Sequence, residues 1–485
     1  MMEDSFTVLA VDLGTSSVKA TLACRSRDSL WHVAARATES LAPPIARADG
    51  WSEQDPLDWC DAAIRAMRGL LKHPAAAGLA AISLSGQMQS LVLADDSGCA
   101  IRPALLYSDA RATSEAALLE EKIGRERLVS ETANWKGAVS VLPKLLWLQY
   151  HEPEALASAS YILLSAHDVL HLVLTGLAVT DPTNASVTGL LAASTSRAAW
   201  ASQLLVEAGF HAALHHKLPH IVSGAASCSP LASSAATELG VPSLAGLPVC
   251  HGAGDLAAVT IGALEVAPTA CYCYLGTSGW VAEESEAPVV SETLRVFIVH
   301  HPTPGRVIMA APTTTACGNV AFLRRLLYSH VPDDDEAYAA IDRAASEAQP
   351  GASGLLYLPY LNGERFPVND PTARACFVGL GAATSSAELC RACYEGIAMS
   401  VRSLLALMPS ANEQRDGCAH PLVLVGGGGA SCLLPQILAD VSQRKVLVPP
   451  RPRDVAALGA ASLAAHALLP ERPASAGAGG GLLGL

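Results

Sequence analysis

Aromatic and charged side chains are scarce in this sequence. Phe, Trp and Tyr make up 5% of its 485 residues, and Asp, Glu, Lys and Arg together make up 16%. Proteins that bind nucleic acids need aromatic rings on which bases stack, or Lys and Arg concentrated on one surface. Here 32 basic residues stand against 45 acidic ones, so the formal charge is 32 − 45 = −13. These shortages exclude nucleic acid as the main partner.

The sequence also lacks a long apolar run. Its mean hydropathy of +0.31 comes largely from alanine, and no stretch of about 18 apolar residues occurs. The nearest candidates, 161–179 and 455–469, are interrupted by polar side chains: His167, Asp168, His171, Ser462 and His466. The acidic, polar start does not match a signal or transit peptide. We therefore expect a cytoplasmic protein with no membrane partner.

Zinc-binding spacing is missing among the 13 cysteines. Cys271 and Cys273 lie in a strand-like run, where alternate side chains point to opposite faces. We therefore expect reduced thiols in a cytosolic enzyme.

Short apolar, strand-like runs alternate with alanine- and leucine-rich helical ones along the whole chain. This pattern is typical of an α/β fold with buried sheets. At roughly 150 residues per domain, the chain should form two or three domains.

A repeated pattern narrows the domain count. Val8 to Val11 and Val18 to Cys24 read as two strands joined by a tight Gly-Thr-Ser-Ser turn, which predicts a β-hairpin. A second Leu-Gly-Thr-Ser unit starts at Leu275, which is 275 − 13 = 262 residues after the first at Leu13. Such spacing indicates an internal duplication. We predict an N-terminal domain over 1–246, a C-terminal domain over 247–470 and a flexible tail over 471–485.

Three glycine turns at strand ends could bind phosphate through backbone N–H groups, which suits an acidic chain. The first follows Asp12, which is a suitable carboxylate for a largely hydrated Mg²⁺. The second is the Gly276–Gly279 turn, and the third is the 426–431 loop between a strand and the helical run 433–441. The third loop is neither a Rossmann fingerprint nor a Walker A loop. An ordinary turn explains each of the three alone. The candidate contacts in the two hairpins are Thr15, Ser16, Ser17, Lys19, Gly276 and Thr277.

Further polar groups follow other strand-like runs. Asp255 comes after Gly252-Ala-Gly254, where it is either an N-cap for the run from Leu256 to Leu264 or a carboxylate that accepts a proton from a substrate hydroxyl. The loops 85–89 and 107–111 offer amides and a carboxylate, which sugar hydroxyls need, although turn and cap roles also explain them.

Taken together, these residues resemble the FGGY carbohydrate kinases, a branch of the actin, hexokinase and heat-shock ATPase superfamily, and most closely its xylulokinases. The resemblance runs from residue 7 to about 465. It is carried by the segments 12–19, 50–56, 85–89, 143–147, 254–255, 275–279, 357–365, 378–380 with 388–389, and 426–431.

The resemblance implies two ribonuclease-H-like domains that close over ATP and a sugar. By position, Asp255 matches the family's catalytic base, and Asp12 with Asp255 the Mg²⁺ carboxylates. Thr15 and Thr277 match phosphate contacts. The adenosine site matches Gly427, Gly428 and Gly429, and the sugar-facing positions match Met88, Gln89 and Asp109. A homodimer is expected. An unperturbed Asp255 would have a pKa near ~4.

Two positions depart from the xylulokinase pattern. Gln89 stands where His is common, and Leu256 stands where Asn is common; a Gly-Asp-Leu run also occurs in sedoheptulokinases. The prediction is an ATP-dependent ketose kinase, with D-xylulose as substrate and sedoheptulose or D-ribulose as rivals. An alternative function of a different class is that of an actin-like ATPase or sugar-binding regulator without phosphotransfer. The presence of Asp255 argues against this alternative. A purely structural helical protein fits poorly with three glycine turns.

Overall fold

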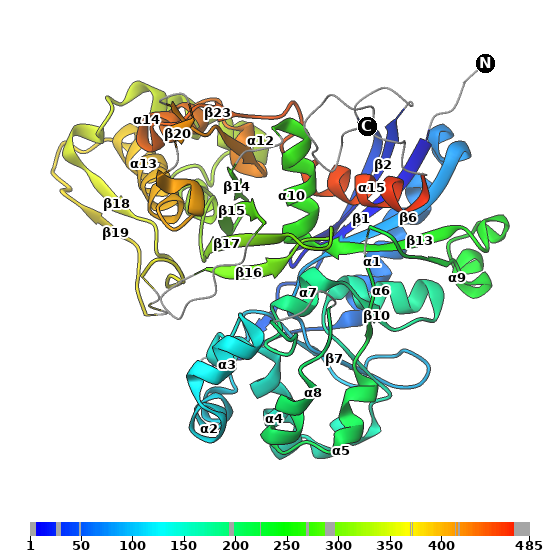
Figure 1. Ribbon diagram of the computed structural model, residues 1–485. Helices are drawn as coiled ribbons and strands as arrows, with labels where there is room; N and C mark the ends of the chain where they lie inside the picture. Colours follow the sequence, from blue (N-terminus) through cyan, green and yellow to red (C-terminus); the bar gives the residue numbers. More distant parts are fainter. Residues whose placement is uncertain are drawn as a thin grey trace.

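The computed structural model describes residues 6–25, 31–47, 50–193, 198–223, 225–267, 271–286, 296–368, 370, 372–412, 414–415 and 418–469. Its two halves are each built on a six-stranded sheet (Figure 1). The predicted tail lies outside the described residues.

The first sheet has the order β12-β13-β6-β1-β2-β3. The first hairpin is confirmed, because β1 and β2 pair antiparallel, while β1 and β6 run parallel. Its strands are β1 (Phe6–Leu13), β2 (Ser17–Arg25), β3 (His32–Ser40), β6 (Leu79–Gly86), β12 (Cys228–Pro230) and β13 (Pro248–Gly254).

Both faces of β1 are buried, and alternate residues face different helices. Leu9 and Val11 share a hydrophobic cluster with side chains of α1 (Pro56–Leu70) and α6 (Ala166–Thr175). Val8 and Ala10 share another with alanines of α15 (Val455–Leu468). The sheet is therefore covered on both sides, as the continuous apolar run predicts.

The second sheet, of order β16-β17-β15-β14-β22-β23, repeats this arrangement. Like β1, β14 pairs antiparallel with the next strand and parallel with a strand far along the chain. The shared topology agrees with a duplicated domain. Its strands are β14 (Cys271–Leu275), β15 (Gly279–Ser285), β16 (Phe297–His300), β17 (Val307–Thr313), β22 (Leu422–Val425) and β23 (Val446–Leu447).

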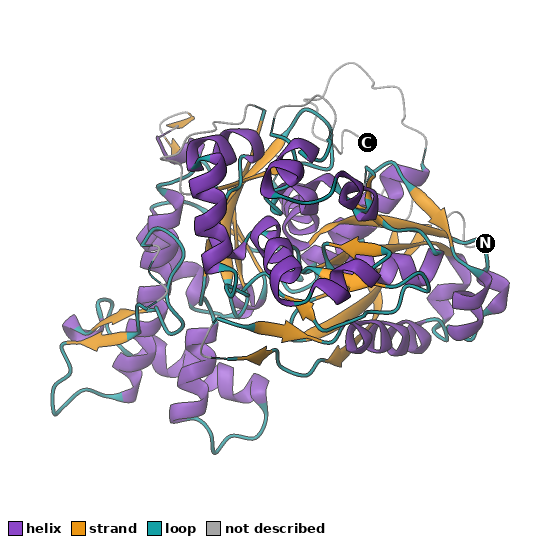
Figure 2. Cartoon of the chain, turned by 90° about the horizontal axis from the view of Figure 1, so that it is seen from below, coloured by secondary structure: helices purple, strands orange, loops and turns teal. Residues whose placement is uncertain are grey.

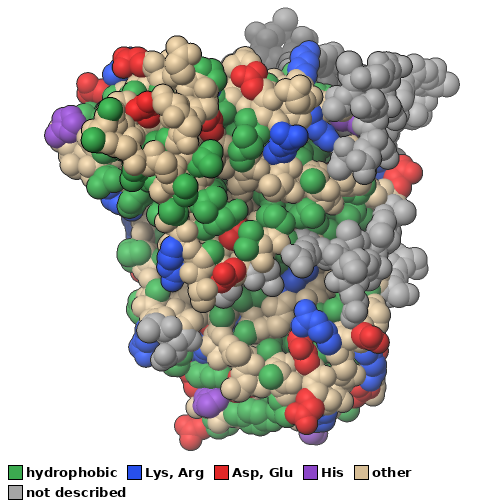
Figure 3. All heavy atoms as spheres, turned by 90° about the vertical axis from the view of Figure 1, so that its left-hand side faces the viewer, with side chains coloured by type: hydrophobic (Ala, Val, Ile, Leu, Met, Phe, Trp, Pro, Cys, Tyr) green, Lys and Arg blue, Asp and Glu red, His purple; other side chains and the backbone are tan. Residues whose placement is uncertain are grey.

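Four helices accompany the second sheet: α11 (Gly318–Leu327), α12 (Asp334–Glu347), α13 (Ser386–Leu405) and α14 (Leu434–Ser442). The hairpin of β18 (Leu356–Leu358) and β19 (Cys376–Val378) projects beside them. It exposes Leu356 and Val378. Figure 3 shows the side of the molecule that lies at the left in Figure 1, where hydrophobic side chains gather.

A mainly helical part, inserted in the first half, lies below the first sheet in Figure 1 and has its own hydrophobic cluster. Its helices are α2 (Thr113–Ile123), α3 (Arg125–Thr132), α4 (Val141–His151), α5 (Pro153–Ser158), α7 (Pro182–Ser186) and α8 (Ser202–Ala208). Short strands border it: β4 (Ile45–Ala46), β5 (Ser52–Gln54), β7 (Val92–Ala94), β8 (Ala104–Leu105), β9 (Tyr161–Leu163), β10 (Val179–Thr180) and β11 (His220–Ile221). Figure 2 shows the molecule from below. Three further short elements are α9 (Ser233–Glu238), β20 (Gln414–Arg415) and β21 (Cys418–Ala419).

Strand β13 opens the segment that we expected to begin the second domain, yet it pairs with β6 in the first sheet. Gly252 and Gly254 both lie within β13. Gly252 has a φ of +70° and lies in a bulge between Cys250 and Ala253. The position requires glycine, because a Cβ there would lie 1.9 Å from the Leu84 carbonyl oxygen. A boundary at 247 would separate β13 from its sheet, so we propose that the crossing follows α10 (Asp255–Val266).

Helix α10 packs closely against α15 between the two sheets. A Cβ at Gly262 would lie 2.3 Å from the Val455 carbonyl oxygen, and one at Gly459 would lie 1.8 Å from that of Ala258. Only glycine allows this approach. The helix that begins with Asp255 is therefore fixed to the body of the molecule.

One expectation about cysteine is wrong. Cys228 and Cys250 stand opposite one another on β12 and β13 and form a disulfide. Their separation of 22 residues gives no hint that strand pairing brings them together.

None of the helices in the described part of the chain is long and apolar enough to cross a membrane.

Candidate active site

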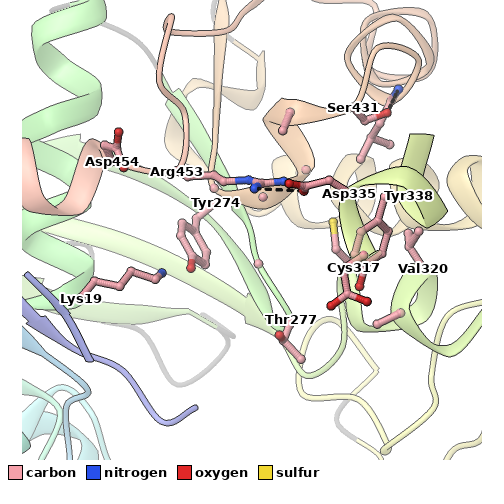
Figure 4. Close-up of a pocket in the computed structure, with 18 of the residues that line it drawn as sticks. Lys19, Tyr274, Thr277, Cys317, Val320, Asp335, Tyr338, Ser431, Arg453 and Asp454 are labelled. Atoms are coloured by element: carbon pink, nitrogen blue, oxygen red, sulfur yellow. Dashed lines mark hydrogen bonds and ion pairs between the residues drawn. The ribbon is translucent and has the colours of Figure 1, made fainter. Parts of the chain in front are cut away.

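Two adjoining cavities, of about 1060 Å³ and 440 Å³, lie between the halves of the molecule. Both are lined by Asp12 and Lys19 from the first hairpin and by Thr277 from the second. Figure 4 shows Lys19 and Thr277 around the larger cavity. The two predicted hairpins therefore meet at one cleft.

Parallel strands bring the chemical groups together. Asp12 lies near the end of β1 opposite Ser85 of β6, and Ala253 of β13 also stands opposite Ser85. The ends of these three strands therefore gather Asp12, the 87–89 loop and Asp255 at one edge of the sheet, as is usual in α/β folds. Asp255 is the first residue of α10 and Gly254 occupies the N-cap position, so the predicted N-cap role is wrong by one position.

The two carboxylates are poorly solvated. Burial raises the pKa of Asp255 to about 7, and the negative charge of Asp12 adds to this effect. Burial also raises the pKa of Asp12, which the Lys19 ammonium opposes. The sequence did not predict this shift from the ordinary pKa of ~4, because the neighbours of Asp255 along the chain reveal neither its burial nor the approach of Asp12.

The hairpin turns are held by their own backbone. Gly14 N–H donates to the Ser17 carbonyl at 3.1 Å, and Gly276 N–H donates to that of Ser278 at 2.9 Å. In the first turn, Thr15 Oγ1 also donates to Gln87 Oε1 at 3.2 Å. Thr15, Ser16 and Ser17 line the smaller cavity, while Gly276 lines the larger one.

The three predicted adenosine-site glycines differ in their surroundings. Gly427 and Gly428 line the larger cavity. A Cβ at Gly428 would meet Leu275 at 2.8 Å, whereas one at Gly427 would meet only the Leu275 carbonyl oxygen, at 3.8 Å. Gly429 packs against Pro452 instead and does not line the cavity.

Sequence reasoning missed the residue that anchors this loop. The Asp342 carboxylate, on α12, accepts hydrogen bonds from Ser431 Oγ at 2.8 Å and Cys432 N–H at 2.9 Å. It also accepts one from the Tyr394 hydroxyl. In the sequence, Asp342 looks like any acidic residue of an exposed helix.

The predicted sugar-facing pair, Met88 and Gln89, lines the smaller cavity together with Asp255 and Leu256. Gln89 Nε2 donates to the Val139 carbonyl at 3.1 Å. The cavity is also lined by Tyr107, from the predicted loop 107–111, and by Arg365, from the segment 357–365. Trp280 and Phe297 line it too, and sequence reasoning gave them no role.

Asp109 is the exception among the predicted sugar contacts. It is fully buried and lines neither cavity. Its carboxylate accepts from Arg111 at 2.7 Å and from Ser52 N–H at 2.6 Å. The Arg111 guanidinium lies over the Trp51 ring at 3.6 Å, so Asp109 neutralises a cation inside the fold.

We expect Asp109→Asn to lower the free energy of unfolding by ~3 kcal/mol, because it weakens a buried ion pair. Urea unfolding measures this change. The matched control is Glu39→Gln, which breaks the exposed pair of Glu39 with Arg65 and should change stability by less than ~1 kcal/mol. Unchanged stability with a raised KM for the sugar would instead make Asp109 a sugar ligand.

Beside the cleft, the described residues include one group that could hold a metal ion: His167, Asp181 and His251. Their potential ligand atoms lie within 4.8 Å of one another. Hydrogen bonds already pair these side chains, since His167 Nε2 lies 3.0 Å from Asp181 Oδ2 and His251 Nε2 lies 3.0 Å from Asp168 Oδ1. For Mg²⁺, the better donor set is the poorly solvated carboxylate pair in the cleft.

Two sheets of one topology, with a hairpin from each meeting at an interdomain cleft, define a two-domain phosphotransferase of the actin and hexokinase type. Family models for the N-terminal and C-terminal domains of the FGGY carbohydrate kinases match residues 7–262 and 271–468. The chain belongs to the FGGY family of carbohydrate kinases.

Known relatives agree in sequence and in structure. The xylulose kinase of Escherichia coli strain K12 is 30% identical over 465 residues, which cover 96% of this chain and 90% of that protein. The xylulose kinase of Streptomyces rubiginosus is 32% identical over 478 residues, covering 96% and 89%. The crystal structure of xylulose kinase from Rhodospirillum rubrum has a TM-score of 0.76 at 27% identity, covering 95% of this chain and 89% of that one.

Proposed function

We propose that the protein transfers the γ-phosphoryl group of ATP to the terminal hydroxyl of a ketose, with D-xylulose as the substrate. The observation that carries this proposal is the position of Asp255. It lies in the 440 Å³ cavity with Met88 and Gln89, beside the hairpins of both domains. The similarity to xylulose kinases across almost the whole chain supports the choice of sugar.

Asp255 is suited to act as the general base. Its pKa of about 7 makes it a stronger base than an ordinary aspartate. This value is still far below the pKa of an alcohol, so the proton moves late, as the bond to phosphorus forms. Closure of the two domains over the substrates would exclude water, which is the competing acceptor.

The carboxylate pair also fits a Mg²⁺ ion, because both pKa values are raised in a buried, negatively charged site. Asp12 and Asp255 would hold this ion, which would offset the negative charge of the ATP phosphates. Lys19 and the hairpin amides place further positive charge and N–H dipoles along the same cleft.

Two residues leave room for a rival ketose. Leu256 cannot hydrogen-bond a sugar hydroxyl, and the Gln89 side chain amide is engaged by Val139. A coupled assay of ADP release over D-xylulose, D-ribulose, sedoheptulose, glycerol and an aldose tests the choice. We expect the highest kcat/KM with D-xylulose. Turnover of glycerol or the aldose, with none for any ketose, would exclude a ketose kinase.

The same assay without sugar separates the kinase from an actin-like ATPase, since a kinase should release little ADP when no sugar is present.

We further propose a cytoplasmic homodimer. The exposed Leu356 and Val378 of the β18–β19 hairpin support self-association, which sedimentation would measure.

A further inference from the structure

Gln89 adopts an unusual backbone conformation. Its φ is 61°, in the left-handed region that residues other than glycine rarely occupy. Such a conformation costs free energy and persists only where the surroundings enforce it, often at functional sites. Gln89 is also buried, with 6% of its surface exposed.

A buried side chain accepts a hydrogen bond from this backbone. Gln89 N–H donates to Asn184 Oδ1 at 3.1 Å, and Asn184, on α7, is fully buried. The amide of Asn184 cannot flip without loss, because its Nδ2 donates to Thr180 Oγ1 at 2.9 Å and to Asp168 Oδ2 at 3.4 Å. The oxygen of the amide therefore stays directed at Gln89.

Further hydrogen bonds extend to β13, the strand that directly precedes Asp255. Asp168 accepts from Leu164 N–H at 3.0 Å through Oδ2, and its Oδ1 lies 3.0 Å from His251 Nε2. His251 lies on β13, four residues before Asp255. A continuous buried chain of hydrogen bonds therefore connects the Gln89 backbone to β13, which ends one residue before Asp255.

We propose that Asn184 is a positioning residue for the sugar, which acts by holding Gln89 in its left-handed conformation. This inference rests on the proposed function, in which the 88–89 segment contacts the sugar. Asn184 lines neither cavity, so it does not face the sugar itself and acts through Gln89.

Asn184→Ala tests this role. We expect the KM for the ketose to rise about tenfold, while the KM for ATP and the dissociation constant of ADP stay within twofold. The matched control is Ser186→Ala on the same helix. Ser186 Oγ donates to the Pro182 carbonyl and accepts from His300 N–H, away from Gln89. This control should leave the KM for the ketose within twofold.

A double-mutant cycle separates positioning from general damage to the fold. Glycine adopts a φ near 61° without strain. In the Gln89→Gly background, Asn184→Ala should therefore change the KM for the ketose by less than twofold. The inference would be overturned if Asn184→Ala raised the KM for the ketose tenfold in the Gln89→Gly background as well. It would also be overturned if Asn184→Ala did not raise this KM in the protein that keeps Gln89. A wild-type protein that phosphorylates no ketose would overturn the proposed function instead.

Discussion

Asp255→Asn is expected to lower kcat for ketose phosphorylation by about 10²- to 10⁴-fold, the range that loss of a general base produces. Asparagine keeps the size of the side chain and its oxygen for Leu256 N–H, which donates to Asp255 at 2.7 Å. It cannot accept the proton of the attacking hydroxyl. Steady-state kinetics with D-xylulose measures the effect, and an unchanged kcat would remove Asp255 from the mechanism.

The same variant should be more stable than the wild type above neutral pH. The pKa of Asp255 is about 7 in the folded protein and near ~4 in an unfolded chain. The folded state therefore binds more protons between these values, and the wild type loses stability as the pH rises from about 4 to 7. Asparagine removes this loss. Melting temperatures at pH 5 and pH 8 should show a gain that is larger at pH 8, whereas an equal or lower melting temperature would contradict the shifted pKa.

Gly427→Val is expected to raise the dissociation constant of ATP about 10- to 100-fold, corresponding to a steric cost of ~1–3 kcal/mol. Gly427 is exposed at the larger cavity, and only the Leu275 carbonyl oxygen, at 3.8 Å, limits a Cβ there. The valine can therefore be accommodated by the fold while it fills space needed by the nucleotide. Titration calorimetry with ADP and with a non-hydrolysable ATP analogue measures the loss.

Gly381→Val is the matched control, because Gly381 is exposed and a Cβ there meets nothing within 4 Å. Both variants should melt within a few degrees of the wild type. Only Gly427→Val should weaken nucleotide binding. Equal ATP affinity in the two variants would place the adenosine site elsewhere in the cleft.

The sequence predicted the parts of the site that depend on local pattern. Both hairpins and the strand–loop–helix around Gly427 were found because turn residues sit beside short apolar runs. It did not predict properties that depend on distant partners. Asp109 looks like a strand-end carboxylate until Ser52 is seen to donate to it across 57 residues.

Burial and strand pairing explain the other differences. The raised pKa of Asp255 comes first from burial and then from the approach of Asp12 on β1, and neither can be read from its neighbours along the chain. The place of β13 in the first sheet depends on its parallel pairing with β6, and the antiparallel pairing of β12 with β13 brings Cys228 to Cys250. Neither the anchoring role of Asp342 nor that of Asn184 has a signal in a single sequence, because each depends on a loop that folds against it.

Phosphorus NMR of the product is the most direct test of the central claim, that the Asp255 cleft moves the γ-phosphoryl group of ATP to a ketose. Wild-type protein with Mg²⁺, ATP and D-xylulose should yield ADP and one phosphate monoester on the terminal carbon, and Asp255→Asn should yield neither in the same time. Inorganic phosphate as the only product, at a rate that no sugar changes, would contradict the account.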